Sequence, residues 1–430
     1  MTSYNYFLSN TLEYYQITDV SRRIQRLRQN RNLVLSRRIA FKTLVEGSYQ
    51  CLDIDRSDSQ RYMLCGSSDG SITVYDLEGP GAMVSMSNRV EYRPIAVVKR
   101  TSKYAHRYAV SSVKWHPHGD CGIFYSSSTD HSVKIWDANA MKPVDEYCFK
   151  TPIFQLDASS APSGAPNLIA VASAHSTVNI IDIITGSSTH NLQRGHTGSA
   201  VVAVQWSPRD PNIVASGGND GRIVLWDVRS AKCMLKSLVC NELMKDSNID
   251  SRHRSHSGAV MGLAFSSDGL YLLSLGTEGC LKQWDAAKLR SVRRNRTGTR
   301  HPYPFVSVSG RKVVSIEIAY DNRPELVFVP DGDNISVVEM SSRKARPRLC
   351  GHFQMVNGVA WRRRSQCLYS VSNDKFLLAW VPKHDDDKTC DMFETQIQTE
   401  HQNPLDKVRP DVPNADDNLL GDSWSDDEEF

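Results

Sequence analysis

Several features that would assign a protein to a class at once are missing from this sequence of 430 residues. It holds no run of 18 apolar residues, the length a membrane-spanning helix needs. The first 16 residues lack the charged start and apolar middle of a signal peptide. The ten cysteines form no CxxC pair and no Cys/His cluster with metal-ligand spacing. These absences predict reduced thiols and a location in the cytosol or nucleus.

Sequence patterns of catalysis are missing as well. The chain has no P-loop, no GxGxxG after a strand and no HExxH. His116 and His118 in HPH have the look of a metal dyad, but two histidines without a third ligand are usually solvent contacts. We therefore expect no catalytic residue, no cofactor and no metal site.

Charge is balanced over the chain and uneven along it. The 51 basic and 48 acidic residues give a net charge of +3, which excludes a polycation that binds nucleic acid by bulk charge. Residues 22–42 nevertheless hold eight bases and no acid, and residues 411–430 hold eight acids and no base. The basic segment also suits a mitochondrial presequence, although Glu13 and Asp19 precede it and argue against that interpretation.

One motif recurs through the middle of the chain. Each copy has a small polar turn, an alternating strand and an aromatic or apolar residue, followed in most copies by Asp. Successive copies end 42 to 61 residues apart, and the shortest intervals match one blade of a β-propeller. The copies are SSDGSITVYD (67–76), STDHSVKIWD (128–137), SAHSTVNIID (173–182), GNDGRIVLWD (218–227), GTEGCLKQWD (276–285), the weaker PDGDNISVVE (330–339) and SNDKFLLAWV (372–381).

A histidine followed by an alternating strand precedes four of these copies. With both signals, the chain resembles the WD-repeat β-propellers over residues 37–382, and seven blades are the most economical count. In such repeats a carboxylate in the turn reaches the buried His above a Trp. The matching sets are His106, Asp130 and Trp136; His196, Asp220 and Trp226; His256, Glu278 and Trp284; and His352, Asp374 and Trp380.

Two blades depart from this pattern. Blade three has His175 in place of the Asp, and blade five has the longer Glu278, so we expect both to be held less tightly. Ser, His and Asp brought together also suit a hydrolase, but their repetition from blade to blade favours a structural role.

An arginine follows the strand of the fourth copy. The segment Trp226-Asp227-Val228-Arg229 matches a Trp-Asp-x-Arg pattern of WD proteins that serve as substrate receptors of cullin-4 RING ubiquitin ligases. In those proteins it docks on the propeller-type adaptor of the ligase. The interior of a blade does not need Arg229, which we place at the rim of one face.

The segment before the propeller has two stripes of apolar residues. The spacing in residues 5–15 predicts a helix with Phe7, Leu8, Leu12 and Tyr15 on one side, and residues 20–35 predict a second, Arg-covered helix with Val20, Ile24, Leu27 and Val34 on its apolar side. We interpret residues 1–36 as a helix-loop-helix arm that inserts into a partner's groove. The alternative is that the arm covers a face of its own propeller.

Further segments narrow the resemblance. The chain is similar over nearly its whole length to the Cockayne syndrome type A family, also called excision-repair cross-complementing protein 8, in FLSNTL, the Arg-rich helix, RYMLCGSSDGSITVYDLE, LWDVR, SSDGLYLLSLGTEGCLKQW, LVFVPDG, FLLAWVP and DSWSDDEE. This implies a nuclear, non-catalytic substrate receptor of a cullin-4 RING ubiquitin ligase. Members act in transcription-coupled nucleotide-excision repair at stalled RNA polymerase II.

The resemblance also implies partners and contact residues. The partners are the damaged-DNA-binding adaptor, the Cockayne type B ATPase and a UV-stimulated scaffold protein. The adaptor-binding positions are Phe7, Leu8, Leu12, Tyr15, Ile24, Leu27, Asp227 and Arg229. A WD-repeat scaffold of a chromatin or RNA-processing complex, without a ligase, is the alternative function.

Loops and the C-terminal end carry weaker signals. The basic segments 290–300, 343–348 and 362–364 suit solvated loops or nuclear-import signals, with direct DNA contact as a minor function. The polar insertion 241–254 is a candidate recognition loop. Residues 383–430 are predicted to be a disordered acidic tail, in which Ser423 and Ser425 suit an acidophilic kinase.

Overall fold

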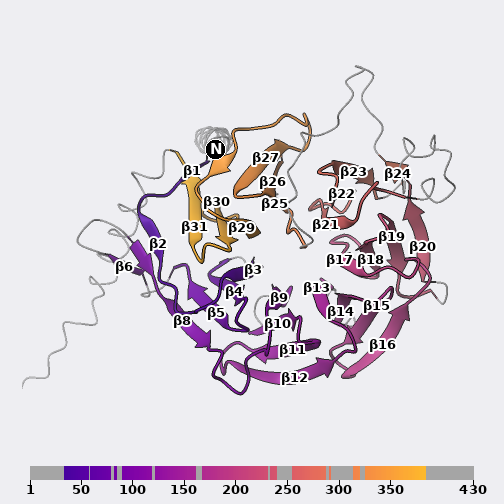
Figure 1. Ribbon diagram of the computed structural model, residues 1–430, viewed down its shortest axis with the longest axis horizontal. Helices are drawn as coiled ribbons and strands as arrows, with labels where there is room; N and C mark the ends of the chain where they lie inside the picture. The colour runs from indigo at the N-terminus through magenta and orange to yellow at the C-terminus, as the bar shows by residue number, and fades with distance from the viewer. Residues whose placement is uncertain are drawn as a thin grey trace, which may run out of the picture. The chain divides into compact units, whose positions relative to one another are not determined.

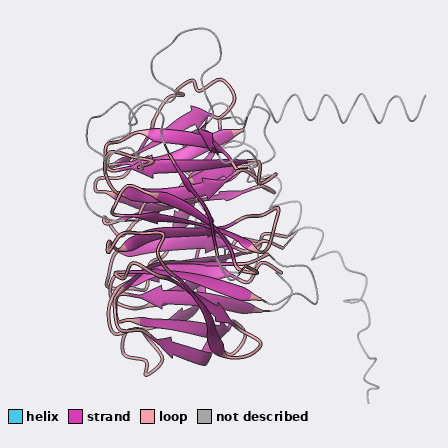
Figure 2. Ribbon diagram, turned by 90° about the vertical axis from the view of Figure 1, so that its right-hand side faces the viewer, coloured by secondary structure: helices cyan, strands magenta, loops and turns pink. Residues whose placement is uncertain are grey.

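The computed structural model describes residues 33–57, 59–78, 82–84, 90–118, 122–160, 167–230, 233–239, 254–286, 290–291, 313–319 and 325–383. The chain divides into two units, Met1–Asp386 and Asp387–Phe430, and all described residues lie in the first. The described residues form strands, turns and loops and contain no helix (Figure 2). No helix among them is therefore long and apolar enough to cross a membrane.

Seven four-stranded antiparallel sheets surround a common centre (Figure 1), which confirms the predicted all-β, seven-bladed WD-repeat propeller. Each sheet is one blade, and its first strand lies innermost. The blades are β3 (Tyr49–Ile54), β4 (Tyr62–Ser67), β5 (Ile72–Asp76) and β8 (Pro94–Val98); β9 (Val110–Trp115), β10 (Ile123–Ser128), β11 (Ser132–Asp137) and β12 (Lys142–Cys148); β13 (Ile153–Ala158), β14 (Leu168–Ser173), β15 (Val178–Asp182) and β16 (Ser187–Leu192); β17 (Val201–Trp206), β18 (Ile213–Gly218), β19 (Ile223–Asp227) and β20 (Met234–Leu238); β21 (Val260–Phe265), β22 (Tyr271–Gly276), β23 (Leu281–Asp285) and β24 (Arg290–Ser291); β25 (Glu317–Ala319), β26 (Leu326–Asp331), β27 (Asn334–Glu339) and β28 (Leu349–Cys350); and β29 (Val356–Arg362), β30 (Cys367–Ser372), β31 (Leu377–Pro382) and β1 (Leu33–Leu35).

The alternating direction of the strands gives the propeller two faces. The tight turns between the second and third strands, such as residues 219–222 of blade four, lie on one face, which we call the turn face. The connections between the first and second strands, such as residues 207–212, lie on the other face, which we call the loop face. Arg229 directly follows a third strand, so it belongs to the loop face.

The hydrophobic core is divided among the junctions between blades. Seven clusters of buried side chains each draw residues from two neighbouring blades. The cluster between blades three and four, for example, combines Ile180 of β15 with Val204 of β17 and Trp226 of β19. Because alternate residues of a strand point to opposite surfaces of its sheet, a central strand with both surfaces buried reads as a nearly continuous apolar run.

The first and last described strands close the ring. β1 pairs with β31 in an antiparallel register that places Leu33 opposite Pro382 and Leu35 opposite Trp380 (Figure 1). The prediction that a helix extends through Val34 is therefore wrong, as is the start of the propeller at residue 37. The run of Leu33, Val34 and Leu35 is instead the fourth strand of blade seven, because β31 has a strand edge that needs hydrogen-bond partners.

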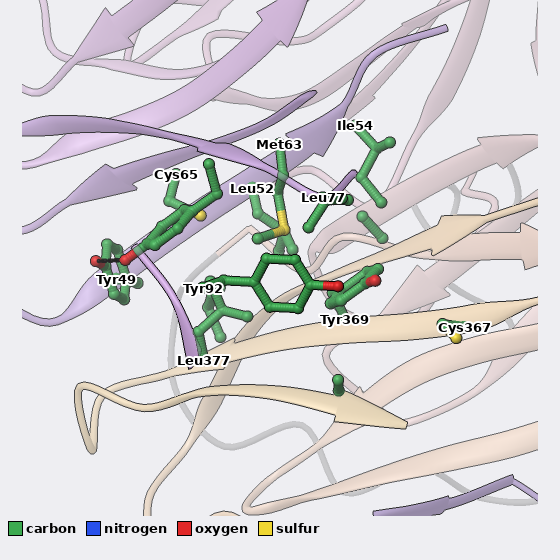
Figure 3. Close-up of a cluster of buried hydrophobic side chains, with 14 of the residues drawn as sticks. Tyr49, Leu52, Ile54, Met63, Cys65, Leu77, Tyr92, Cys367, Tyr369 and Leu377 are labelled. Carbon is green, nitrogen blue, oxygen red and sulfur yellow. Dashed lines mark hydrogen bonds between the residues drawn. The ribbon is translucent and has the colours of Figure 1, made fainter. Parts of the chain in front are cut away.

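A three-stranded accessory sheet lies beside the junction of blades seven and one. Its strands are β2 (Ile39–Phe41), β7 (Val90–Tyr92) and β6 (Ala82–Val84). Phe41 stacks on Tyr92 at 5.2 Å between ring centroids and meets Tyr369 of blade seven edge-on at 5.9 Å. Figure 3 shows the buried cluster at this junction, in which Tyr92 and Tyr369 lie among aliphatic and sulfur-containing side chains.

Arg362, at the end of β29, also bridges blades seven and one. Its side chain is buried, donates to the backbone oxygen of Gln60 at 2.9 Å and forms an ion pair with Glu78. The prediction that residues 362–364 form a solvated basic loop is therefore wrong for Arg362. Arg364 is exposed.

Several predictions concern residues outside the described ranges. The arm residues Phe7, Leu8, Leu12, Tyr15, Ile24 and Leu27 belong here, as do the insertion 241–253, most of the basic segment 290–300, and the tail with Ser423 and Ser425. The last described strand, β31, ends at Pro382.

Candidate protein-interaction site

A buried hydrogen-bond network connects four side chains in blade four. Trp226 Nε1 donates to Ser216 Oγ at 2.7 Å, Ser216 Oγ lies 2.8 Å from His196 Nε2, and His196 Nδ1 lies 3.1 Å from Asp220 Oδ1. Because an indole N–H can only donate, the Ser216 hydroxyl is left to donate to Nε2. His196 then keeps its proton on Nδ1 and donates it to Asp220. The serine is buried and fully engaged, which fits a structural role and no nucleophilic one.

The same four-residue network occurs in three other blades. The His Nδ1 to carboxylate distances are 3.0 Å for His106 and Asp130, 2.6 Å for His256 and Glu278, and 2.8 Å for His352 and Asp374. The serines that link these histidines to Trp136, Trp284 and Trp380 are Ser126, Ser274 and Ser370.

Burial and hydrogen bonding fix the protonation states of these networks. Burial lowers the pKa of the His256 and His352 imidazoles below their ordinary value, which favours the neutral rings. Burial also raises the pKa of Glu278, but the hydrogen bond with His256 outweighs it and lowers that pKa to about 2. The same opposition holds the pKa of Asp130 and Asp220 below their usual range. The carboxylates therefore stay ionised at neutral pH.

The two blades expected to be held less tightly differ from each other. In blade five the longer Glu278 reaches its histidine, and its second oxygen accepts from the Gly258 backbone N–H at 3.3 Å. In blade three the positions of Ser and Trp hold the buried apolar residues Val171 and Ile181, and the His175 ring bonds the Thr177 hydroxyl at 3.0 Å. Weaker stability of either blade stays a prediction.

Arg229 lies on the loop face and is fixed there by two carboxylates. Its Nε and one terminal nitrogen bond the two oxygens of Asp227 at 3.0 and 2.8 Å, and the terminal nitrogen also lies 3.7 Å from Asp210. The hydrogen bond from Arg229 lowers the pKa of Asp227. The Arg229 side chain is nevertheless 59% exposed, so part of its guanidinium remains open to a partner. An exposed ion pair of this kind orients a side chain more than it stabilises the fold.

Two exposed apolar residues follow Arg229 in the chain. Met234 and Leu235 begin the outer strand β20 and are 47% and 45% exposed. Met234 pairs with Trp226, so the outer edge of blade four carries apolar surface beside the strand that leads to Arg229. We call Asp227, Arg229, Met234 and Leu235 the Arg229 patch. Sequence analysis missed its apolar part, although two large apolar residues in an outer, water-facing strand were a signal.

The remaining candidate residues form no second site. His116 is buried, and its Nδ1 accepts from the His118 backbone N–H at 3.1 Å. No group of three or more His, Cys, Asp or Glu side chains within the described ranges is arranged to hold a metal ion. In the basic segment 343–348, Arg346 pairs with Glu339 and Arg348 lies 3.2 Å from Asp331.

A family description matches three of the repeats, and one known protein matches most of the chain. The family description "WD domain, G-beta repeat" matches residues 98–137, 186–227 and 249–285, which end in blades two, four and five. The chain is 27% identical over 414 residues to "WD repeat-containing protein ATCSA-1" of Arabidopsis thaliana, covering 82% of this chain and 89% of the relative. These matches and the fold show that the chain is a WD40-repeat protein.

Two other relatives match a smaller share of this chain. The chain is 25% identical over 293 residues to "Radiation-sensitive protein 28" of Saccharomyces cerevisiae, covering 62% of this chain and 55% of the relative. It is 32% identical over 233 residues to "Ribosome biogenesis protein WDR12 homolog" of Drosophila mojavensis, covering 54% of this chain and 49% of the relative. The chain thus spans about half the length of these two proteins.

Proposed function

We propose that this WD40-repeat protein belongs to the Cockayne syndrome type A family and is a non-catalytic substrate receptor of a cullin-4 RING ubiquitin ligase. It acts in the nucleus, in transcription-coupled nucleotide-excision repair at stalled RNA polymerase II. The plant relative whose name contains CSA and the yeast relative named for radiation sensitivity support a role in repair. WD40 propellers are typically scaffolds for other proteins, which suits a receptor without an active site.

The observation that carries the proposal is the state of Arg229. A guanidinium that is already oriented by Asp227 loses little conformational entropy when it binds. Arginine and methionine are enriched in protein interfaces, and arginine is frequent among the residues that dominate binding energy. The Arg229 patch therefore suits the adaptor, and the predicted stripe with Phe7, Leu8, Leu12, Tyr15, Ile24 and Leu27 supplies a second contact. The Cockayne type B ATPase and the UV-stimulated scaffold protein are the proposed repair partners.

The test is co-purification of the cullin adaptor with full-length protein. Arg229→Ala should reduce recovery of the adaptor, and adding Leu12→Asp and Leu27→Asp should abolish it, with an unchanged circular dichroism spectrum. The matched control is Arg222→Ala, in the same blade but on the turn face. Full recovery of the adaptor with the triple variant would contradict the proposal.

The second candidate function is a scaffold in an RNA-processing complex without a ligase. The fly relative named for ribosome biogenesis favours it, because this chain is 32% identical to that protein over 233 residues. Affinity purification from nuclear extract before and after ultraviolet irradiation separates the two functions. A ligase receptor returns the adaptor and, after irradiation, polymerase. A scaffold of the second kind returns preribosomal proteins in both conditions.

A further inference from the structure

The carboxylate of each Asp network also organises the turn face. In blade seven Asp374 accepts from the His352 ring and from the backbone N–H groups of Phe353 and Phe376, at 3.1 and 2.9 Å. The backbone N–H groups of these two residues are therefore held against one carboxylate. The corresponding residues are Arg107 and Ser132 in blade two, and Thr197 and Arg222 in blade four.

The comparison between blades shows that the network does not require aromatic residues there. Blades two and four use polar residues in the same two positions and keep the same hydrogen bonds. Phe353 and Phe376 are 82% and 54% exposed, so their rings are not used to build the core. An exposed apolar pair that folding does not explain is typical of a binding surface.

The residue between Asp374 and Phe376 supplies the charge of this surface. Lys375 has a φ of 70°, in the left-handed region that favours glycine. Blades one, four and five place Gly70, Gly221 and Gly279 at this point of the turn, and blade two places His131 with a φ of 73°. Lys375 is exposed, and it forms no ion pair with another described residue.

The charged side chains of this surface favour a negatively charged ligand. Both oxygens of Asp374 are already occupied by hydrogen bonds and the side chain is buried, so it cannot receive a cation from a partner. The exposed Lys375 ammonium can instead form an ion pair with a carboxylate of a partner. Two phenylalanines on either side accept bulky apolar or aromatic side chains.

We infer that Phe353, Lys375 and Phe376, the blade-seven apex, form a docking surface for an acidic protein segment that carries bulky apolar side chains. The apex lies on the turn face and the Arg229 patch on the loop face, so one molecule binds such a segment and the adaptor at the same time. This inference goes beyond ligase association, because the apex binds the segment whether or not an adaptor is present.

The experiment measures binding of full-length protein to a fluorescein-labelled synthetic peptide in which Leu and Trp alternate with Asp and Glu. The triple variant Phe353→Thr, Lys375→Gly and Phe376→Arg copies the residues of blade four and leaves the net charge unchanged. Fluorescence anisotropy should show at least tenfold weaker binding for the triple variant and an intermediate loss for Lys375→Gly alone. Tyr108→Ala, an exposed aromatic on the turn face of blade two, is the matched control and should bind normally.

Several results would overturn the inference. These are no binding to the unaltered protein, equal binding by the triple variant, and equal binding of a peptide in which Lys replaces every acid. Self-association of the unaltered protein that the triple variant loses would assign the apex to a second copy of the chain instead. Thermal unfolding must show that the triple variant is folded, and its adaptor co-purification should be unchanged, which separates this inference from the proposed ligase function.

Discussion

Blades four and seven have the same interior and different edges. Both contain the Trp–Ser–His–carboxylate network with closely similar distances. On the turn face, Asn219-Asp220-Gly221-Arg222 of blade four corresponds to Asn373-Asp374-Lys375-Phe376 of blade seven. On the loop face, blade four ends in Trp226-Asp227-Val228-Arg229 and blade seven in Trp380-Val381-Pro382. The network fixes the position of each edge without fixing its residues, so the edges are where function distinguishes one blade from another.

The largest expected effect is common to both blades. Trp226→Ala and Trp380→Ala should each lower the free energy of unfolding by about 3–5 kcal/mol, because each removes a buried ring and leaves a serine hydroxyl short of a donor. Urea unfolding followed by intrinsic fluorescence measures the loss. Val144→Ala, in an exposed outer strand, is the control and should change stability by under about 0.5 kcal/mol. A large loss in only one of the two blades would break the comparison.

Exchanging the turn residues should reveal a difference between the blades. A Cβ at Gly221 would lie 2.5 Å from the His256 oxygen and 2.7 Å from the Gly258 oxygen, both backbone atoms of the next blade. Gly221→Lys should therefore cost about 2 kcal/mol or more. Lys375→Gly relieves a strained φ but loosens the unfolded chain, and should change stability by about 1 kcal/mol or less. Thermal unfolding of the two variants measures both effects. A change at Gly221→Lys as small as that at Lys375→Gly would contradict the predicted difference between the blades.

Acid should weaken the networks in two steps. Burial lowers the pKa of His256 and His352, so the unfolded chain takes up protons near pH 6.5 while the native rings resist. This contribution is complete above pH 6.5 and is lost as the pH falls below it. The pKa of Glu278 is lowered to about 2, so its contribution is complete above the unfolded value and is lost between about pH 4 and 2. Denaturant midpoints measured from about pH 8 to 2 follow both steps, and flat stability from about pH 7 to 5 would contradict the first.

The smallest expected effect on stability is at the exposed edge of blade four. Arg229→Ala should leave the stability of the fold unchanged, because its ion pair is solvent-exposed. Differential scanning calorimetry of the variant and the unaltered protein is the measurement. A clear drop in melting temperature would make Arg229 a structural residue rather than a binding one.

Much of the fold could be predicted from the sequence because its signals are local. The small-polar turn, the alternating strand and the terminal Trp-Asp all lie within ten residues of each other, and His196 and Asp220 belong to one blade. Closure of the ring was not predictable in this way. Val34 fits a helical stripe when only its neighbours are considered, yet it pairs with Val381 at the other end of the propeller.

The candidate site residues also divide into those that local sequence predicts and those that depend on distant parts of the chain. Arg229 could be found because Trp226 and Asp227 beside it define the motif. The burial of Arg362 could not, because its partner Glu78 belongs to blade one, 284 residues away along the chain. Phe353 and Phe376 become a pair only when the structure shows that both bind Asp374.

The most direct test of the central claim is the equilibrium affinity of the purified full-length protein for the cullin-4 adaptor, measured for the unaltered chain, Arg229→Ala and Arg222→Ala by biolayer interferometry. If the edge of blade four on the loop face fastens the propeller to the ligase, Arg229→Ala should weaken binding at least tenfold at unchanged melting temperature, and Arg222→Ala should bind normally. Equal affinity of all three proteins would contradict the claim.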